Sequence, residues 1–136
     1  MIPEEYRELF ENKIFRQIMD SIDDVVMVID CDTRIVYVNQ AYEKTFHWSR
    51  EQIIGKKLED LEGDTTAITA MKTGEPMYHK LEYLKSAKID AMGVSFPIRY
   101  HGETVGGISI FNNTAKYVEL VSKLQRTKEM NRYLQE

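Results

Sequence analysis

Hydrophobic residues near the amino terminus follow a helical spacing. Between residues 4 and 22 they recur mostly three or four positions apart, which places them on one face of a helix. Pro3 followed by Glu4 and Glu5 is typical of a first helical turn, because proline loses no hydrogen bond there and acidic groups favour the positive end of the helix dipole. The pattern predicts an amphipathic helix over residues 1–22. Its apolar stripe consists of Tyr6, Leu9, Phe10, Ile14, Ile18 and Ile22.

The next part of the chain, residues 23–114, contains runs that are typical of strands. Residues 25–29 are almost all β-branched and predict a buried strand. In residues 92–98 the hydrophobic positions alternate with others, and Pro97 indicates that this strand lies partly at an edge. Turn-forming residues join the first two runs and the last two, so each pair predicts a hairpin. The runs are 25–29, 34–39, 77–84, 92–98 and 103–111.

Short helical segments separate the second strand from the third. Ser49 and Gln52 have the spacing of a capping box, and Asp64 or Thr65 can cap a further helix that runs through Met71. Because the strands do not alternate with helices, the sequence predicts an α+β fold. We expect an antiparallel sheet of about five strands with short helices on one face, flanked by the N-terminal amphipathic helix and a long C-terminal helix.

The last part of the chain, residues 115–136, contains neither glycine nor proline and predicts that long helix. Half of its heptad seam positions are polar or weakly apolar. This helix is therefore a poor coiled coil alone but a plausible one within a longer chain. We therefore expect a dimerisation helix over 1–22, a core over 23–114, and a signalling helix over 115–136 that leads to an output domain outside this chain. The seam positions are Tyr117, Leu120, Leu124, Thr127, Asn131 and Leu134.

Composition narrows the class of protein. The 136 residues are 43% hydrophobic and 29% charged, as in an ordinary folded domain. The formal net charge of −4 argues against direct nucleic-acid binding. Cys31 is the single cysteine, so no intrachain disulfide forms. The longest apolar run, residues 25–29, is too short to span a bilayer, and we expect a cytoplasmic protein without membrane contact.

No recognised catalytic motif occurs in the chain. The glycine-flanked serine of hydrolases, the glycine-rich phosphate loop and the paired histidines of zinc proteases are all missing from the sequence. The three histidines, His47, His79 and His101, are far apart and have no two-histidine metal spacing. We therefore expect neither an enzyme nor a metal site.

Several segments resemble the PAS domain family. Residues 18–39 read IMDSIDDVVMVIDCDTRIVYVN, which resembles a PAS opening, where a helix leads into a strand, an acidic turn and a second strand that ends in a characteristic asparagine, here Asn39. Residues 41–55 and 102–111 resemble the next segment and the final strand of that family. The resemblance covers residues 18–116 and implies a sensory or regulatory module in bacterial signal transduction.

One subgroup looks most similar. Residues 72–76, KTGEP, together with 96–98, FPI, look most like the PAS domains that precede the AAA+ module of sigma-fifty-four-dependent bacterial transcription regulators. Sensor histidine kinases and diguanylate cyclases carry similar modules, so each remains an alternative parent. The chain departs from the family in its acidic turn, where a glycine is usual near Thr33 or Arg34 and none is present.

The resemblance implies a pocket between the sheet and the short helices that takes a small organic effector or stays empty. The residue after Asn39 is not the reactive cysteine of the flavin photosensors, and no histidine fits a haem ligand with confidence, so no cofactor is predicted and a haem or flavin redox sensor is a lesser alternative. The expected polar contacts are Asn39 or Ser95. The expected apolar lining is Met27, Ile29, Tyr42, Phe46, Ile54, Met71, Met92 and Phe96.

A second hypothesis needs no ligand. An apolar helix stripe outside the core is a liability on a monomer, so Phe10, Ile14 and Ile18 are expected to pair two protomers of a homodimer. The pairing would continue through Tyr117, Leu120 and Leu124 toward the output domain. The two hypotheses are compatible, and the sequence leaves the ligand, the output domain and the sign of regulation open.

Overall fold

The computed structural model describes residues 2–113 and 120–128, apart from the side chains of His79 and Lys80. The helices of its main body are α1 (Glu4–Glu11), α2 (Lys13–Asp20), α3 (Gln40–Phe46), α4 (Arg50–Ile53), α5 (Leu58–Glu62) and α6 (Thr66–Thr73). The strands are β1 (Val25–Asp30), β2 (Ile35–Val38), β3 (Met77–Leu84), β4 (Ile89–Tyr100) and β5 (Glu103–Asn113). Residues 120–128 are also helical.

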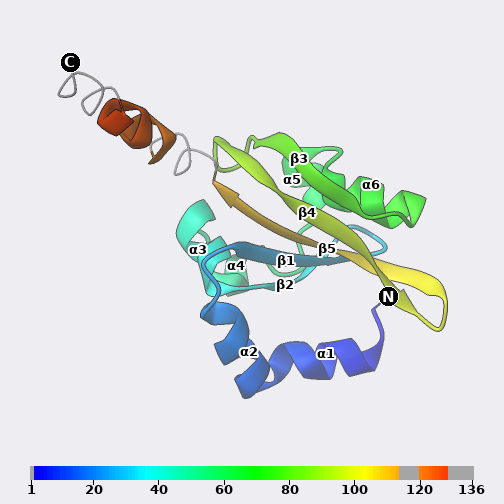
Figure 1. The fold of residues 1–136 in the computed structure, drawn as a ribbon. Helices are drawn as coiled ribbons and strands as arrows, with labels where there is room; N and C mark the ends of the chain where they lie inside the picture. The colour runs from blue at the N-terminus through cyan, green and yellow to red at the C-terminus, as the bar shows by residue number, and fades with distance from the viewer. Residues whose placement is uncertain (1, 114–119, 129–136) are drawn as a thin grey trace, which may run out of the picture.

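All strands join one antiparallel sheet in the order β2-β1-β5-β4-β3. The helices α3 to α6 pack on one face, here called the inner face, and α1 and α2 lie across part of the opposite, outer face (Figure 1). The predicted α+β fold, with an antiparallel sheet of about five strands and short helices on one face, is confirmed.

The strand β1 is buried on both faces. Its residues Val25, Met27 and Ile29 belong to the inner cluster, whereas Val26 and Val28 belong to the outer one. Successive side chains of a strand point to opposite faces, so a strand covered by helices on both sides becomes apolar throughout. This explains the uninterrupted hydrophobic run that predicted a buried strand.

The predicted N-terminal helix is two helices, which corrects the expectation of one continuous helix. Asn12 ends α1 and caps α2, because its side-chain oxygen accepts a hydrogen bond from the backbone N–H of Phe15 at 2.9 Å. The bend allows two rings to pack on Tyr37 of β2, with ring centroids 5.2 Å away for Phe10 and 5.4 Å for Phe15. The bend at Asn12 therefore allows α1 and α2 to cover the outer face of β1 and β2.

The strand β4 passes from the interior to the edge of the sheet along its length. Its pairing with β3 reaches only to Ser95, opposite Met77, while its pairing with β5 continues past Pro97. Proline cannot donate a ladder hydrogen bond, and Pro97 lies where β4 has lost its β3 neighbour. The predicted edge position is confirmed.

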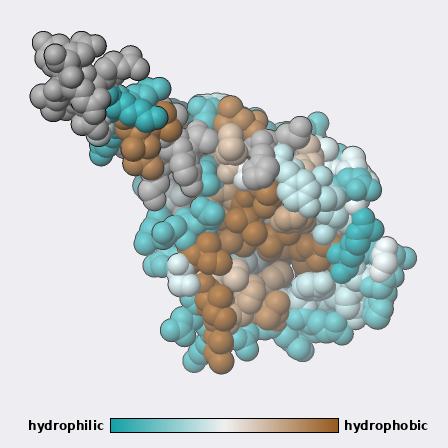
Figure 2. Space-filling model, viewed as in Figure 1, coloured by the Kyte–Doolittle hydropathy of each residue, from teal (hydrophilic) through white to brown (hydrophobic). Residues whose placement is uncertain are grey.

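Much of the outer face beyond β1 and β2 lies outside the cover of the N-terminal helices. Figure 2 shows hydrophobic residues forming a band that runs from the middle of the sheet onto α2. Residues 120–128 extend away from the sheet (Figure 1). Large exposed hydrophobic side chains lie on α1, α2, β3, β4 and residues 120–128, among them Leu9, Ile14, Ile18, Tyr78, Leu81, Tyr83, Met92, Leu120, Val121 and Leu124.

Candidate functional site

The inner face encloses a small cavity between the sheet and the helices. Its volume is about 20 Å³, which accommodates roughly one water molecule. Hydrophobic and polar side chains share the lining, which is Met27, Tyr42, Phe46, Leu58, Leu61, Glu62, Thr65, Ala67, Glu82, Leu84, Ser109 and Phe111. The packed inner face therefore leaves no room for a drug-sized ligand, which needs a cavity of about 300–1,000 Å³.

The structure brings only part of the predicted pocket together. Three of the predicted residues, Met27, Tyr42 and Phe46, line the cavity. Two others, Ile29 and Met71, are buried in the same inner cluster without lining it. Another, Ile54, lies partly exposed along a separate groove beside α1, α2 and β2.

Two predicted residues lie on the wrong face of β4. The register pairs Phe96 with Ile108, which belongs to the outer cluster, and Met92 shares the face of Phe96. The inner positions of β4 carry smaller residues, including Ala91 and Ser95. The hydrophobic alternation identified a strand correctly, but its large side chains face outward and α6 packs on the small ones.

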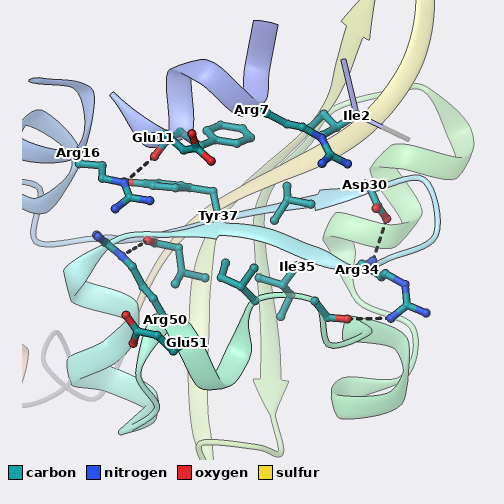
Figure 3. A pocket seen from close by; sticks show the side chains of 15 residues that line it. Ile2, Arg7, Glu11, Arg16, Asp30, Arg34, Ile35, Tyr37, Arg50 and Glu51 are labelled. Carbon is teal, nitrogen blue, oxygen red and sulfur yellow. Dashed lines mark hydrogen bonds between the residues drawn. The ribbon is translucent and has the colours of Figure 1, made fainter. Parts of the chain in front are cut away.

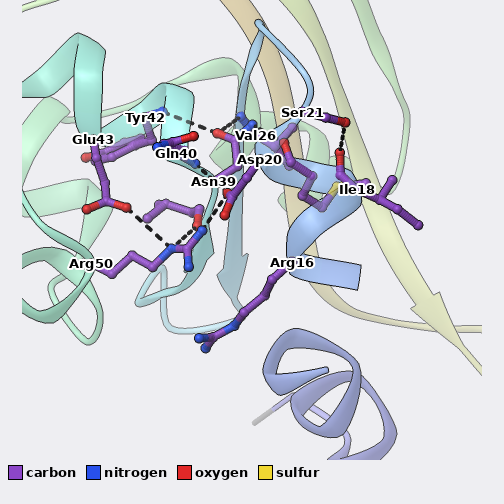
Figure 4. A network of polar contacts seen from close by, with 12 residues as sticks. Arg16, Ile18, Asp20, Ser21, Val26, Asn39, Gln40, Tyr42, Glu43 and Arg50 are labelled. Carbon is purple, nitrogen blue, oxygen red and sulfur yellow. Dashed lines mark hydrogen bonds and ion pairs between the residues drawn. The ribbon is translucent and has the colours of Figure 1, made fainter. Parts of the chain in front are cut away.

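The two predicted polar contacts are engaged within the protein. Asn39 is fully buried. Its amide nitrogen donates to the carbonyls of Met19 and Asp24 at 3.1 and 2.9 Å, and its oxygen accepts from the N–H groups of Val26 and Tyr42 at 2.9 and 3.2 Å (Figure 4). This uses all four bonding sites of a side-chain amide, so Asn39 has a structural role and no atom left for a ligand.

Ser95, the other predicted polar contact, lies in a hydroxyl chain. Its Oγ lies 3.1 Å from the Oγ of Ser109 and 3.0 Å from the Oγ1 of Thr66. The chain continues to Glu82, which accepts from the Thr66 backbone N–H at 2.9 Å and from its hydroxyl at 3.2 Å. Ser95 is therefore connected to the cavity through a carboxylate that the sequence pattern did not single out.

Glu62 and Glu82 are the acidic cavity residues that sequence reasoning missed. Burial raises the pKa of Glu82, and the neighbouring charge of Glu62 raises it further against the opposing hydrogen bonds from Thr66. Burial and the charge of Glu62 likewise raise the pKa of the Tyr42 phenol. The alternation in residues 77–84 was too loose to show that Glu82 points inward.

Asp20 and Arg50 connect the N-terminal helices to the core. The Arg50 Nη2 lies 2.6 Å from the Oδ1 of Asp20, and its Nε donates to the carbonyl of Val38 at 3.0 Å (Figure 4). The same Asp20 oxygen accepts from the backbone N–H of Gln40 at 2.8 Å. The end of α2 is thus fastened to α3 and α4 by charge-assisted bonds, which are stronger than neutral ones.

Two of the histidines serve in backbone turns. His47 ends α3 with φ of 59°, and His101 occupies the β4–β5 turn with φ of 51°. Both are exposed, and the side chain of His79 lies outside the described residues. Within residues 2–113 and 120–128 no three acidic, histidine or cysteine side chains come together as a possible metal site, and no helix in these ranges has the length and hydropathy to cross a bilayer.

The predicted dimer residues occupy different surroundings. Ile14 and Ile18 are 69% and 54% exposed on α2, but Phe10 is buried against Tyr37 in its own chain. Leu120 and Leu124 are exposed on the helix of residues 120–128. Tyr117, the remaining predicted dimer residue, lies outside the described residues.

Comparison with known proteins gives consistent matches. The family model of the PAS fold matches residues 13–76. A probable C4-dicarboxylate sensor kinase of Halalkalibacterium halodurans is 26% identical over 105 residues. That match covers 77% of this chain but only 19% of the relative, so the chain spans about a fifth of that protein's length.

Solved structures resemble the chain over most of its length. The PAS domain of nitrogen regulation protein NR(II) from Vibrio parahaemolyticus has a TM-score of 0.60 at 15% identity, covering 75% of this chain and 99% of that one. The PAS domain of Bordetella pertussis BvgS has a TM-score of 0.61 at 22% identity, covering 84% of this chain and 92% of that one. At these identities the likeness establishes the fold.

Proposed function

We propose that this chain, whose residues 13–76 match the family model of the PAS fold, is a homodimerising sensory module of a signalling protein that relays a signal to an output domain. The observation that carries the proposal is the contrast between its two faces. The inner face is packed down to a cavity of about 20 Å³, while the outer surface exposes a band of hydrophobic side chains (Figure 2).

The packed inner face favours the ligand-free form of the module over an organic effector bound in the core. An effector of drug size needs more than ten times the available volume. It would have to displace well-packed side chains such as Phe46 and Phe111, whose rings meet edge to face at 6.2 Å, and such repacking has a cost. Signals would then reach the module through its surface and its terminal helices.

The hydrophobic band supports pairing with a second copy of the chain. Ile14 and Ile18 are one helical turn apart on α2 and project from the same side. On the outer face of the sheet, Leu81 pairs with Met92 across β3 and β4, and both are exposed. A two-fold dimer that brings α2 against α2 would remove this surface from water, because the same patch serves both copies.

The output domain is the finer part of the proposal. The relative in Halalkalibacterium halodurans, a probable C4-dicarboxylate sensor kinase, supports a sensor-kinase parent, and the sigma-fifty-four-dependent regulator becomes the alternative. Exposed Leu120 and Leu124 would continue the pairing toward either output. A cytoplasmic location is part of the same proposal.

Sedimentation of the purified chain tests the dimer. At high micromolar concentration we expect a dimer, and Ile18→Asp is expected to weaken association at least tenfold by placing a charge within the interface. The control is Lys72→Asp, which places the same carboxylate at an exposed position of α6, on the inner side of the sheet and away from α2. A monomeric parent chain, or an Ile18→Asp variant that associates like the control, would refute the proposal.

A further inference from the structure

A groove of about 550 Å³ lies outside the core, between the N-terminal helices and the edge of the sheet. One wall is formed by α1 and α2, and the other by β2, α4 and the residues that follow α4 (Figure 3). A second hollow of about 500 Å³ adjoins it, and both are lined by Arg16 and Arg50. The two guanidinium groups therefore lie where the hollows meet.

The groove is rich in arginine. Arg7, Arg16, Arg34 and Arg50 line it, and among the described residues only Arg50 of these four has a carboxylate partner. The Nε of Arg16 donates to the Phe10 carbonyl at 2.6 Å, and Arg34 donates to a backbone carbonyl. These bonds orient the side chains but leave further guanidinium N–H groups for a ligand.

Acidic side chains balance part of this charge. Glu11, Asp30 and Glu51 also line the groove. One oxygen of Asp30 already accepts from the backbone N–H groups of Asp32 and Arg34, at 2.9 and 3.0 Å. In the adjoining hollow, Lys13 adds a cation and Asp20 holds Arg50. The charged residues that line this hollow are three cations, Lys13, Arg16 and Arg50, and one carboxylate, Asp20.

Tyr37 supplies the observation that indicates a ligand. Tyr37 lines the groove and is only 2% exposed, yet its hydroxyl has no hydrogen-bond partner among the described residues. Arg50 lies over the ring, with its Cζ 5.7 Å from the centroid. A buried hydroxyl without a partner is rare in proteins, and beside two guanidinium groups it adds one more donor to the groove.

The phenol of Tyr37 stays protonated under ordinary conditions. Burial raises its pKa above the usual value of 10.0, with a smaller contribution from the charge of Asp20, against the lowering effect of Arg50 and Arg16. It is therefore a hydrogen-bond donor at neutral pH. Arg16 of α2, Tyr37 of β2 and Arg50 of α4 therefore all bring hydrogen-bond donors to the same groove.

We propose that this groove binds a small oxyanion, a carboxylate or phosphate compound, through Arg16, Arg50 and the hydroxyl of Tyr37. Arginine donors match the geometry of carboxylate and phosphate groups. Arg7 and Arg34, farther along the same groove, offer cations to a second acidic group of the ligand. Because Arg16 belongs to α2 and Arg50 to α4, the anion would link the N-terminal helices to the core.

Calorimetric titration of the whole chain tests this site. Succinate and inorganic phosphate are titrated separately at constant ionic strength, with sodium chloride as the reference salt. Tyr37→Phe removes only the unpartnered hydroxyl, so we expect the fold to be retained and the affinity for the bound anion to fall about tenfold. Arg16→Gln should abolish saturable binding, and Arg126→Gln, an exposed arginine outside the groove, should leave it unchanged.

The outcomes separate the two sources of anion. Saturable binding of succinate alone identifies a carboxylate site, and binding of phosphate alone identifies a phosphate site. Either result supports the proposal if Tyr37→Phe weakens it and the thermal midpoint of that variant is not lowered. Absence of saturable binding for both anions, or equal binding by Tyr37→Phe and the parent, overturns it. Sedimentation of the same variants shows whether the dimer persists, so failure here is distinguishable from failure of the proposed function.

Discussion

At the scale of single residues, Asn39 shows how one buried side-chain amide can hold three segments of the chain together. It bonds to the end of α2, to the segment before β1 and to the start of α3. The resemblance to the PAS family singles out this position and predicts a ligand contact there. Only the structure shows that every donor and acceptor of Asn39 is already in use.

The substitution Asn39→Asp tests this role with almost no change in shape. It replaces two donors with a carboxylate that would face two backbone carbonyls, so we expect the free energy of unfolding to fall by about 2–4 kcal/mol. Urea denaturation measures the change. The control is Gln40→Glu, the same chemical exchange at the exposed neighbouring residue, where a change within about 0.5 kcal/mol is expected. Equal effects at the two positions would contradict the assignment.

The acidic turn and the end of α3 place ordinary residues where glycine is usual. Thr33 has φ of 65° and His47 has φ of 59°, both in the left-handed region that costs a side-chain-bearing residue about 1–2 kcal/mol. The missing glycine near Thr33 was apparent from the sequence. The role of His47 was not, because a histidine at a helix end gives no signal of left-handed backbone.

Replacing His47 with glycine is expected to stabilise the protein by about 0.5 kcal/mol, since relief of the left-handed backbone outweighs the added freedom of the unfolded chain. The measurement is the urea midpoint. Lys44→Gly, an exposed position inside α3, should destabilise by about 1 kcal/mol. A His47→Gly variant that loses as much stability as Lys44→Gly would show that the turn carries no such strain.

At the scale of elements, the sequence predicted which segments are strands better than it predicted which way they face. The alternation in residues 92–98 predicts a strand whichever face of the sheet its hydrophobic side chains point to. The face is decided by α6, which packs on the inner face of β4 and β5 and leaves Met92 and Phe96 on the outer face. A similar limit applies to the N-terminal segment, where helical spacing continues across the break at Asn12 and only the capping bond to Phe15 reveals two helices.

The contact between β3 and α6 predicts a pH effect. Because the pKa of Glu82 is raised by burial in the folded state, the folded chain holds a proton that the unfolded chain releases. Its contribution to stability is therefore greatest below about pH 4.5, the ordinary value, and is lost as the pH rises through the raised pKa.

Glu82→Gln removes the loss of stability that accompanies ionisation of Glu82, while it keeps a side-chain oxygen that accepts from the Thr66 N–H. We expect the variant to be more stable than the parent near neutral pH, with the advantage shrinking as the pH approaches 4.5, the unshifted value. Urea midpoints across this range measure it. Exposed Glu75→Gln is the control and should not show the trend. A variant less stable than the parent at neutral pH would mean that the bonds from Thr66 outweigh the burial of charge.

At the scale of the whole molecule, the two faces of the sheet differ in how they are covered. The inner face is closed, and the outer side carries both the hydrophobic band and the arginine groove beside α2. Sequence reasoning predicted the fold, and helical spacing placed Ile14 and Ile18 on one stripe of a helix, where the structure shows both exposed. It missed the groove, since Arg16 and Arg50 are brought together only by the packing of α2 beside α4.

Disulfide trapping between two copies of the chain tests the proposed dimer most directly. Ile18→Cys is introduced together with Cys31→Ser, which removes the exposed natural thiol, and Lys72→Cys in the same background serves as an exposed control on α6. If α2 faces α2, mild oxidation should join the Ile18→Cys copies at least tenfold faster than the control copies, because the interface raises the effective concentration of the thiols. Equal rates of joining at the two positions would contradict the account.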